Sequence, residues 1–491
     1  MKLETAIRYL GARPASADID PALAATEVTN FVIDSREVQA GDVFFALSQP
    51  DYRNNGFNGD FEDATIYVAS AFERGALAAV VRPDRYDEHR AALEKYRDRL
   101  VLVGDCIGAL QRLAAGVYES WNRPVVGITG SAGKTSAKEL TAHVLEATGR
   151  KVLKNVKNYN NGLGLPLTVL NLDKDPSYEV AVLEMGMSTP TGEIRRLCEI
   201  TPPDVAIELN VLPVHIEHLG TIENIQKAKA ELIQGMKETG TAVLNADDEL
   251  VLDMRRLVRG GSITYGIQNP ADITATDIRF ERFGDTRFTI SIFGESAEVV
   301  FPLNGRHNVM NALAAAGAAS VFGISASQIA SSLSSVEPPP QRGEVIHLAP
   351  DITVINDSYN SNPNALLSMV DTLVEGSAGA SRRVVVAGEM LELGDDAARI
   401  HREIGQKIAE RNVDLLVGVR GLAAEMVKGA LSGGMRAEFV EDSAAAAELA
   451  RKVIRPGDAV LVKGSRGVRC EKVVDSLLES FEPEAGEATR A

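Results

Sequence analysis

Residues 127–136 have the sequence GITGSAGKTS, the clearest structural motif in this chain. An apolar run, Val125–Thr129, enters a glycine-rich turn, and a helix-favouring run over residues 136–148 leaves it. Backbone N–H groups of such a turn cradle phosphates, a lysine meets the terminal phosphates, and a hydroxyl holds Mg²⁺. The strict phosphate-loop pattern has glycine where this chain has Ile128, so the short form TGxxGKT remains. The predicted nucleotide-binding residues of the loop are Gly130, Ser131, Ala132, Gly133, Lys134, Thr135 and Ser136.

Around this loop, the segment 121–337 alternates between apolar runs and helix-like stretches. Strands are predicted over 180–183, 205–209 and 242–245, and a closing helix over 309–322. Strands that alternate with helices favour a parallel α/β sheet. Residues 272–301 alternate instead in short β-like runs, which predicts an antiparallel insertion. The segment is therefore predicted to be a central ATPase-type domain.

The segment before it, residues 1–120, opens with a short helix. Extended runs follow at 31–34 and 43–47, and the segment ends in the helix Cys106–Trp121. The polar stretch 49–60 is rich in Gly and Asn and is predicted to be a loop. These features predict a smaller α/β domain.

The last segment, residues 338–491, begins at three consecutive prolines, 338–340, which suit a domain boundary. Predicted strands over 353–356, 384–387, 415–419 and 459–463 alternate with helical stretches. This pattern is typical of a doubly wound, Rossmann-like unit. The predicted fold class is therefore α/β with three domains, at 1–120, 121–337 and 338–491.

Composition excludes several classes of function. The chain has 491 residues, and 51 Lys and Arg against 68 Asp and Glu give a formal net charge of −17. Such a polyanion is a poor general binder of DNA or RNA, so no nucleic-acid partner is expected. Cys106, Cys198 and Cys470 have no metal-ligand or disulfide spacing, which favours a reducing cytosol. No run reaches about 18 apolar residues, and the first residues lack a signal-peptide pattern, so we expect a cytoplasmic protein without membrane insertion.

Side chains at two strand ends are candidate metal ligands. Glu184 directly follows the strand 180–183, where a Mg²⁺ ligand belongs beside a phosphate loop. The run NVLPVHIEH at 210–218 follows the strand 205–209 and predicts a second metal site. His215 is the candidate ligand there, with His218 as the alternative.

Four motifs together make the chain similar to a known family. They are TGSAGKT at 129–135, NYNNGLGLPLT at 158–168, NGRHNVMNA at 304–312 and QRGE at 341–344. Each motif is moderately specific, but all four occur in the order and at the distances found in Mur ligases. The sequence resembles the Mur ligase family, whose members add amino acids to the peptidoglycan precursor, over essentially its whole length.

The last segment resembles the branch of this family that adds D-alanyl-D-alanine. DSYNSNP at 357–363 resembles that branch's DxYNxNP signature, and GEMLELG at 388–394 and KGSR at 463–466 are also similar to it. The DNPR-type motif of the diamino-acid-adding branch is absent. DSR at 34–36 and GDVFFAL at 41–47 resemble the family's uridine-binding start, whereas the expected DGHxF run is replaced by NGFNGDF at 55–61.

The resemblance implies a ligase that uses ATP to form an amide bond through an acyl phosphate. It implies that UDP-N-acetylmuramoyl-tripeptide and D-alanyl-D-alanine are joined in the cytoplasmic stage of peptidoglycan synthesis, with ATP and two Mg²⁺ ions. We expect a monomer. The implied catalytic residues are Lys134, His215, Lys229 and Arg342. Nucleotide-binding residues beyond the loop are His307, Asn308, Arg342 and Asp357, and metal ligands are Thr135, Glu184, His215 and Lys229 as a carbamate. The UDP-substrate is assigned to Ser35, Arg36, Phe45, Ala46, Asn160 and Asn161, and the dipeptide to Asn360 and Asn362.

Lys229 lies in a helical stretch fourteen residues after His215 and matches the family's carbamylated lysine by position. An ammonium beside two Mg²⁺ ions would be repelled, whereas a carbamate offers the anionic oxygens that hard cations prefer. The alternative is an ordinary surface lysine paired with Glu231. Lys227 is the less suitable carrier because a two-residue shift points it to another side of the helix.

Three further alternatives stay open. Asn362, which precedes Pro363, also fits the N-cap of a helix over 363–375. The chain could be another ligase of the same fold, such as a folylpolyglutamate synthase or the diamino-acid-adding Mur ligase, or a nucleotide-dependent scaffold without catalysis. The third residue of the peptide substrate, meso-diaminopimelate or L-lysine, is not fixed by the sequence.

Overall fold

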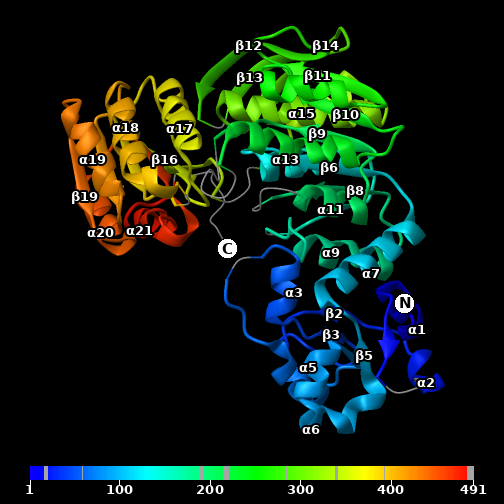
Figure 1. The fold of residues 1–491 in the computed structure, drawn as a ribbon. Helices are drawn as coiled ribbons and strands as arrows, with labels where there is room; N and C mark the ends of the chain where they lie inside the picture. The colour runs from blue at the N-terminus through cyan, green and yellow to red at the C-terminus, as the bar shows by residue number, and fades with distance from the viewer. Residues whose placement is uncertain are drawn as a thin grey trace.

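The computed structural model describes residues 1–15, 20–57, 59–156, 158–187, 192–213, 220–283, 285–337, 341–391 and 393–483. The chain forms three lobes, each built around one β-sheet (Figure 1). The N-terminal lobe is blue to cyan, the central lobe is mostly green, and the C-terminal lobe is yellow to red. The predicted α/β class with three units is therefore confirmed. The prolines predicted as a domain boundary, 338–340, lie outside the described residues.

The N-terminal lobe holds a five-stranded sheet in the order β1-β5-β4-β3-β2, in which only the β1–β5 pair is antiparallel. Its elements are α1 (Leu3–Leu10), β1 (Arg13–Pro14), α2 (Pro21–Ala24), β2 (Phe31–Val32), β3 (Val43–Phe45), α3 (Gln49–Asn54), α4 (Val68–Glu73), β4 (Ala78–Val81), α5 (Pro83–Glu88), α6 (Arg90–Leu93), β5 (Leu100–Leu102) and α7 (Cys106–Trp121). The helix predicted at α7 is confirmed with the same bounds.

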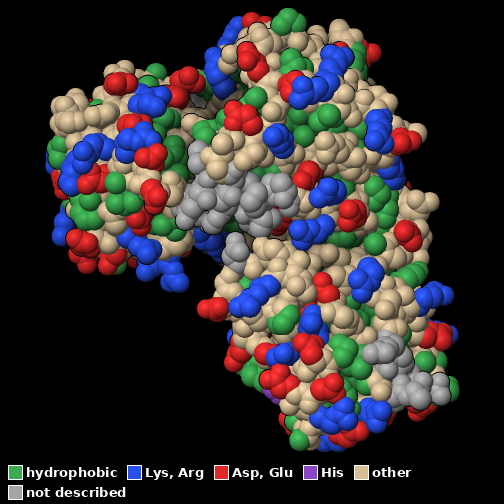
Figure 2. Space-filling view, in the orientation of Figure 1, with side chains coloured by type: hydrophobic (Ala, Val, Ile, Leu, Met, Phe, Trp, Pro, Cys, Tyr) green, Lys and Arg blue, Asp and Glu red, His purple; other side chains and the backbone are tan. Residues whose placement is uncertain are grey.

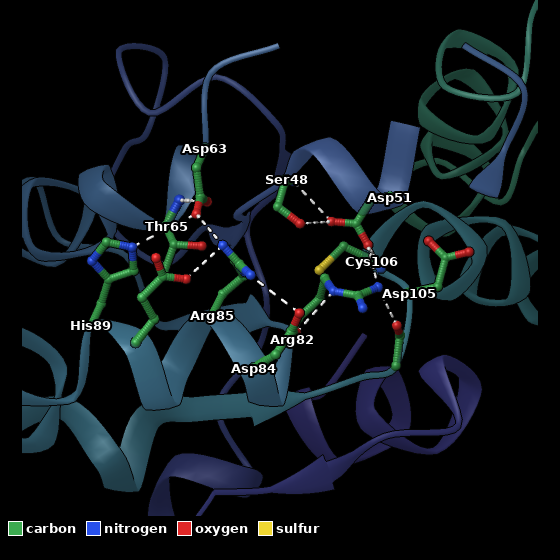
Figure 3. A network of polar contacts seen from close by, with 12 residues as sticks. Ser48, Asp51, Asp63, Thr65, Arg82, Asp84, Arg85, His89, Asp105 and Cys106 are labelled. Atoms are coloured by element: carbon green, nitrogen blue, oxygen red, sulfur yellow. Dashed lines mark hydrogen bonds and ion pairs between the residues drawn. The ribbon is translucent and has the colours of Figure 1, made fainter. Parts of the chain in front are cut away.

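The stretch 49–60, predicted to be a loop, begins instead with helix α3, and that part of the prediction is wrong. Ser48 and Asp51 form a capping box at its start, and Asp51 is completely buried. The Asp51 carboxylate accepts hydrogen bonds from Ser48 N at 2.8 Å and Cys106 N at 2.8 Å, and lies 3.5 Å from Arg82 Nη1 (Figure 3). Burial raises the pKa of Asp51. This carboxylate thus fixes both α3 and the start of α7.

The central lobe holds a nine-stranded sheet in the order β14-β13-β12-β11-β10-β9-β6-β8-β7. Its elements are β6 (Val125–Thr129), α8 (Lys134–Glu146), β7 (Val152–Lys154), α9 (Gly164–Val169), α10 (Asn171–Lys174), β8 (Val180–Glu184), α11 (Glu193–Ile200), β9 (Val205–Glu208), α13 (Ile222–Gly235), β10 (Thr241–Asn245), α14 (Glu249–Asp253), β11 (Gly261–Gly266), β12 (Ile273–Arg282), β13 (Asp285–Ile292), β14 (Glu295–Phe301), α15 (Arg306–Val321) and α16 (Ala326–Leu333). The predicted antiparallel strands are confirmed as β12 to β14, and they extend the parallel sheet because β12 pairs with β11.

The C-terminal lobe holds a six-stranded sheet in the order β15-β16-β20-β17-β18-β19, parallel except for its edge strand β15. Its elements are β15 (Glu344–Leu348), β16 (Ile352–Asp357), α17 (Pro363–Gly376), β17 (Arg382–Gly388), α18 (Ala397–Ala409), β18 (Leu415–Val419), α19 (Ala423–Ser432), β19 (Ala437–Val440), α20 (Ser443–Val453), β20 (Asp458–Lys463) and α21 (Glu471–Ser480). The four strands predicted here are confirmed, and β15 and β19 were not foreseen.

Buried apolar clusters connect the central lobe more extensively to the N-terminal lobe than to the C-terminal lobe. One cluster runs from Phe45 in the N-terminal lobe through Leu113 on α7 to Leu183 and Leu232 in the central lobe. The C-terminal sheet has two clusters of its own, and Phe283, between β12 and β13, is the one described central-lobe residue that belongs to either. On the face drawn in Figure 2, side chains of both charge signs are intermixed. Among the described ranges, no helix has the length and apolar character needed to cross a bilayer.

Candidate nucleotide and metal site

The glycine-rich turn lies at the carboxyl end of β6 and leads directly into α8. Gly133 precedes the helix with a φ of 85°, and a Cβ atom placed there would lie 2.6 Å from Asn311 Oδ1. Only glycine adopts this backbone conformation freely and leaves that room. The close packing against Asn311 and the positive φ therefore explain why glycine occupies this position of the turn.

A polar residue after the neighbouring strand holds the turn in place. Asn210, which follows β9, accepts a hydrogen bond from Ala132 N at 2.8 Å and donates one to Ala132 O at 3.1 Å. Ser131 Oγ also donates to Leu212 O at 3.1 Å. These contacts fix the loop before any ligand binds, a role that sequence reasoning did not assign to Asn210.

Two of the predicted metal ligands lie side by side. Thr135 Oγ1 donates a hydrogen bond to Glu184 Oε2 at 2.8 Å, and Asn160 Nδ2 donates one to Glu184 Oε1 at 2.8 Å. A hydroxyl and a carboxylate this close suit a hard cation such as Mg²⁺, which usually completes its shell with phosphate oxygens and water. Among the described residues, no three His, Cys, Asp or Glu side chains gather as a metal cluster. The Thr135–Glu184 pair thus fits a Mg²⁺ ion that accompanies a nucleotide.

Lys134 is the first residue of α8 and is half-buried rather than exposed. Its Nζ donates a hydrogen bond to Gly130 O at 2.8 Å, across the turn. Burial lowers the pKa of Lys134, the Glu184 carboxylate opposes this shift, and the Arg342 guanidinium adds to it. Lys134 and Arg342 come from different lobes and line the same cavity, so the two lobes meet at the loop.

A cavity of about 530 Å³ opens beside the loop and is bounded by both lobes. Its volume lies in the range of small-molecule sites. Among its lining residues are these predicted ones: Ser131, Ala132, Gly133, Lys134, Thr135, Ser136, Asn160, Glu184, His307, Asn308, Arg342, Asp357, Asn360 and Asn362. The His307 ring lies 3.0 Å from Ser368 Oγ through its Nδ1, and burial lowers the pKa of His307 to about 4. His307 is therefore neutral near pH 7.

The DSYNSNP motif forms the C-terminal wall of this cavity. Asn362 Oδ1 accepts a hydrogen bond from Ala365 N at 2.9 Å, so the predicted N-cap of α17 is confirmed. Asp357 forms an ion pair with the buried Lys463, which also donates to Asn360 O at 2.9 Å. Asn360 and Asn362 both line the cavity, so capping and ligand contact are compatible.

Lys229 is only 2% exposed on α13, which contradicts the ordinary surface lysine. Glu231, the partner in that alternative, instead accepts hydrogen bonds from Gly192 N at 2.7 Å and Arg195 N at 3.1 Å. Burial lowers the pKa of Lys229 to about 7, with Lys134 adding to the shift and Glu208 opposing it. Lys227, two residues earlier, is exposed.

Comparisons with known proteins point to the same family along most of the chain. Residues 128–319 match the family model of the Mur ligase middle domain, and residues 341–466 match that of the Mur ligase glutamate ligase domain. The UDP-N-acetylmuramoyl-tripeptide–D-alanyl-D-alanine ligase of Bacillus subtilis is 32% identical, over 94% of this chain and 95% of that protein. This chain belongs to the Mur ligase family.

Solved structures extend the likeness to the arrangement of the lobes. A crystal structure of MurF from Acinetobacter baumannii has a TM-score of 0.84 and 27% identity, covering 97% of this Mur ligase and 98% of that chain. MurF ligase from Thermotoga maritima in complex with ADP has a TM-score of 0.77 and 28% identity, covering 94% and 99%. Within the family, the resemblance to the D-alanyl-D-alanine-adding branch is thus confirmed.

Glu208 is a residue of this Mur ligase that sequence reasoning missed. It ends β9, is fully buried, and neither carboxylate oxygen has a hydrogen-bond partner among the described residues. Burial raises the pKa of Glu208 well above its usual range, and Lys229 opposes this shift. The available signal is the acid at the end of the apolar run VAIE, a run whose pattern predicts only a strand.

The predicted UDP-substrate residues of this Mur ligase belong to two lobes, with Asn160 and Asn161 in the central one. Ser35 and Arg36 lie in a turn of the N-terminal lobe, where the Arg36 side chain is bound to Asp34. Phe45 and Ala46 are fully buried in the core, so their side chains offer no surface to a ligand. Asn161 Oδ1 accepts from Gly164 N at 2.9 Å, beside α9. The predicted metal ligand His215 and its alternative His218 lie outside the described residues.

Proposed function

We propose that this Mur ligase joins D-alanyl-D-alanine to UDP-N-acetylmuramoyl-tripeptide in peptidoglycan synthesis, at the expense of ATP. The observation that supports it most is one cavity with a phosphate loop on one wall and the DSYNSNP motif on the other. The relative from Bacillus subtilis carries this activity in its name, and the match covers nearly the whole of both chains. The UDP-linked substrate and ATP place the reaction in the cytoplasm.

The reaction proceeds in two transfers. A carboxylate oxygen of the tripeptide attacks the γ-phosphorus of ATP, the bond to the bridging oxygen breaks, and ADP leaves with an acyl phosphate formed. The dipeptide amine then attacks the acyl carbon, the C–O bond to phosphate breaks, and the amine loses a proton as the amide forms. Lys134 and the N–H groups of the turn stabilise the charge on the transferring phosphoryl group. Arg342 approaches the same group from the C-terminal lobe.

The proposed metal ligands form two groups, one for each Mg²⁺ ion. Bound Mg²⁺ neutralises charge on the phosphates during the transfer. Thr135 and Glu184 would hold one ion, since their oxygens lie 2.8 Å apart at the loop. We assign Lys229, as a carbamate, and His215 to the second ion. The burial of Lys229 and the pKa near 7 support the carbamate, because only a neutral amine attacks CO₂.

The lobes take separate parts in this reaction. We assign residues 1–120 to the UDP-sugar peptide through Ser35 and Arg36, residues 121–337 to ATP, and residues 338–491 to the incoming dipeptide through Asn360 and Asn362. His307 and Asn308 lie at the start of α15, on the cavity wall where the nucleoside would be bound. We expect the protein to act as a monomer, because the proposed reaction uses residues of a single chain.

A phosphate-release assay tests the proposal. UDP-N-acetylmuramoyl-tripeptides ending in meso-diaminopimelate or in L-lysine are each supplied with ATP and one amine acceptor. We expect phosphate release with D-alanyl-D-alanine and none with diaminopimelate, L-lysine or L-glutamate. Release with a single amino acid instead would indicate the diamino-acid-adding or folylpolyglutamate activity, and no release with any acceptor would indicate a scaffold.

A further inference from the structure

Two guanidinium groups lie against the ring of Tyr359, in the middle of the DSYNSNP motif. The Cζ atom of Arg342 lies 4.0 Å from the ring centroid, and that of Arg466 lies 5.0 Å from it. Tyr359 and Arg342 line the nucleotide cavity, whereas Arg466 is exposed next to this wall. An aromatic face attracts and orients a guanidinium group, so the ring holds both arginines at the edge of the site.

Neither guanidinium forms an ion pair with a carboxylate of the described residues, although the chain has 68 acidic residues. Lys463, from the same KGSR motif as Arg466, is different because it is buried and paired with Asp357. Two like charges on one ring repel each other unless an anion comes between or beside them. The arrangement therefore provides positive charge that the fold itself does not neutralise.

The backbone that carries Arg466 is held from both sides. The buried Ser465 accepts a hydrogen bond through its Oγ from Leu391 N at 3.1 Å. Arg420 Nη1 donates to Gly467 O at 2.7 Å. A side chain on a fixed backbone, resting on an aromatic ring, loses little conformational entropy when it binds a ligand.

The length of the dipeptide indicates which anion each of the two arginines binds. Its amine must reach the acyl carbon near Lys134, where the phosphates of the nucleotide also lie. An extended dipeptide spans about 7 Å, so its carboxylate lies well away from its amine and from those phosphates, which repel it. Arg342 lines the cavity together with Lys134, so we assign it to the phosphoryl group. Arg466 is exposed next to the cavity wall and is therefore available to bind the carboxylate of the dipeptide.

We propose that Arg466 binds the C-terminal carboxylate of the incoming dipeptide, with Tyr359 holding its guanidinium plane in position. This inference rests on the proposed ligase function. The planar fork of arginine matches a carboxylate through two parallel hydrogen bonds, which lysine cannot reproduce. Asn360 and Asn362, on the same wall, are then left to bind the body of the dipeptide.

The test compares D-alanyl-D-alanine with D-alanyl-D-alaninamide, which lacks the negative charge. The intact enzyme should favour the acid over the amide by about 10- to 100-fold in kcat/KM, the effect of one charged, bidentate contact. Arg466→Met should raise the KM for the acid by about that factor and remove the preference. Arg466→Lys should keep only part of the preference. The KM values for ATP and for the UDP-tripeptide should not change.

Arg451→Met is the matched control, because Arg451 is an exposed arginine on α20 that does not line the cavity. It should preserve both the KM for the acid and the preference. The inference is overturned if Arg466→Met keeps the preference, or if its KM rises for ATP or the UDP-tripeptide instead. An unchanged KM for ATP also shows that the variant is folded. If the intact enzyme releases no phosphate with D-alanyl-D-alanine, the proposed function fails first and this inference with it.

Discussion

Replacement of Lys229 by methionine should abolish ligation and at the same time raise the stability of the protein. The side chain is 2% exposed, and its pKa of about 7 lies well below the usual 10.5. At pH 7.5 about three quarters of such amines are neutral, against about 0.1% at the usual pKa. The structure thus increases the form that reacts with CO₂ by several hundredfold, which is what a carbamate ligand needs.

The same shift destabilises the folded protein. Because the folded pKa is lower than the unfolded one, the unfolded chain binds more protons between about pH 7 and 10.5, and the contribution of Lys229 to stability rises with pH across this window. At pH 7 the cost of burying the amine is on the order of 5 kcal/mol as an upper limit. Methionine has a similar length and no charge, so Lys229→Met should remove this cost.

Phosphate release and thermal melting together check the prediction in CO₂-depleted buffer. Lys229→Met should lose most activity and melt at a higher temperature than the wild-type protein. Short carboxylic acids should restore part of the activity of Lys229→Ala by filling the vacated anion site, and bicarbonate should activate the unmodified enzyme. Lys227→Ala, at the exposed position two residues earlier, should do none of this. Full activity of Lys229→Met, or a lower melting temperature, would refute the reasoning.

Three further outcomes are expected. Lys134→Met should not lower the melting temperature, because burial already lowers the pKa of Lys134 and its Nζ bonds only Gly130 O among the described residues. It should lose at least about 10²-fold in kcat, and near-normal turnover would contradict the role of the loop. Folding favours the neutral ring of His307, because burial lowers its pKa to about 4. The free energy of unfolding should therefore fall as the pH drops from about 6.5 to 4. His307→Gln should weaken this pH dependence in urea titrations. Small-angle scattering should show a smaller radius of gyration when a nucleotide analogue and the UDP-tripeptide are both bound, and an unchanged radius would count against lobe closure.

Local patterns predicted the regular elements well. Buried parallel strands are continuous apolar runs, and β6, β8 and β9 were therefore visible to within a residue. The loop before α8 was predictable because glycine, lysine and hydroxyl occur at fixed spacing. Helix α3 was missed because its Gly- and Asn-rich surroundings hid the capping box of Ser48 and Asp51, whose carboxylate is stabilised by contacts with distant residues.

The parts of the site that escaped prediction depend on contacts between distant segments. The neighbours of Lys229 in the sequence are compatible with a surface helix, and only the packing of α13 buries it. Glu208 escapes prediction because one acid in an apolar run does not reveal whether its carboxylate is buried. Phe45 and Ala46 matched a family motif, yet both contribute side chains to the core. Motifs thus locate chemistry along the chain but do not say which atoms face a ligand.

The apolar contacts of Phe283 set the energy scale of lobe motion. Apart from this one ring, the described apolar clusters of the C-terminal lobe are its own, so swinging that lobe away exposes roughly one aromatic side chain, or about 2–3 kcal/mol. A cost of that size is small enough for the C-terminal lobe to move away from the central lobe in the free protein, and the binding of nucleotide and UDP-tripeptide can draw it back. The N-terminal and central lobes share a continuous core and would have to unfold to separate. We therefore expect the enzyme to move as two bodies, although it is built from three lobes.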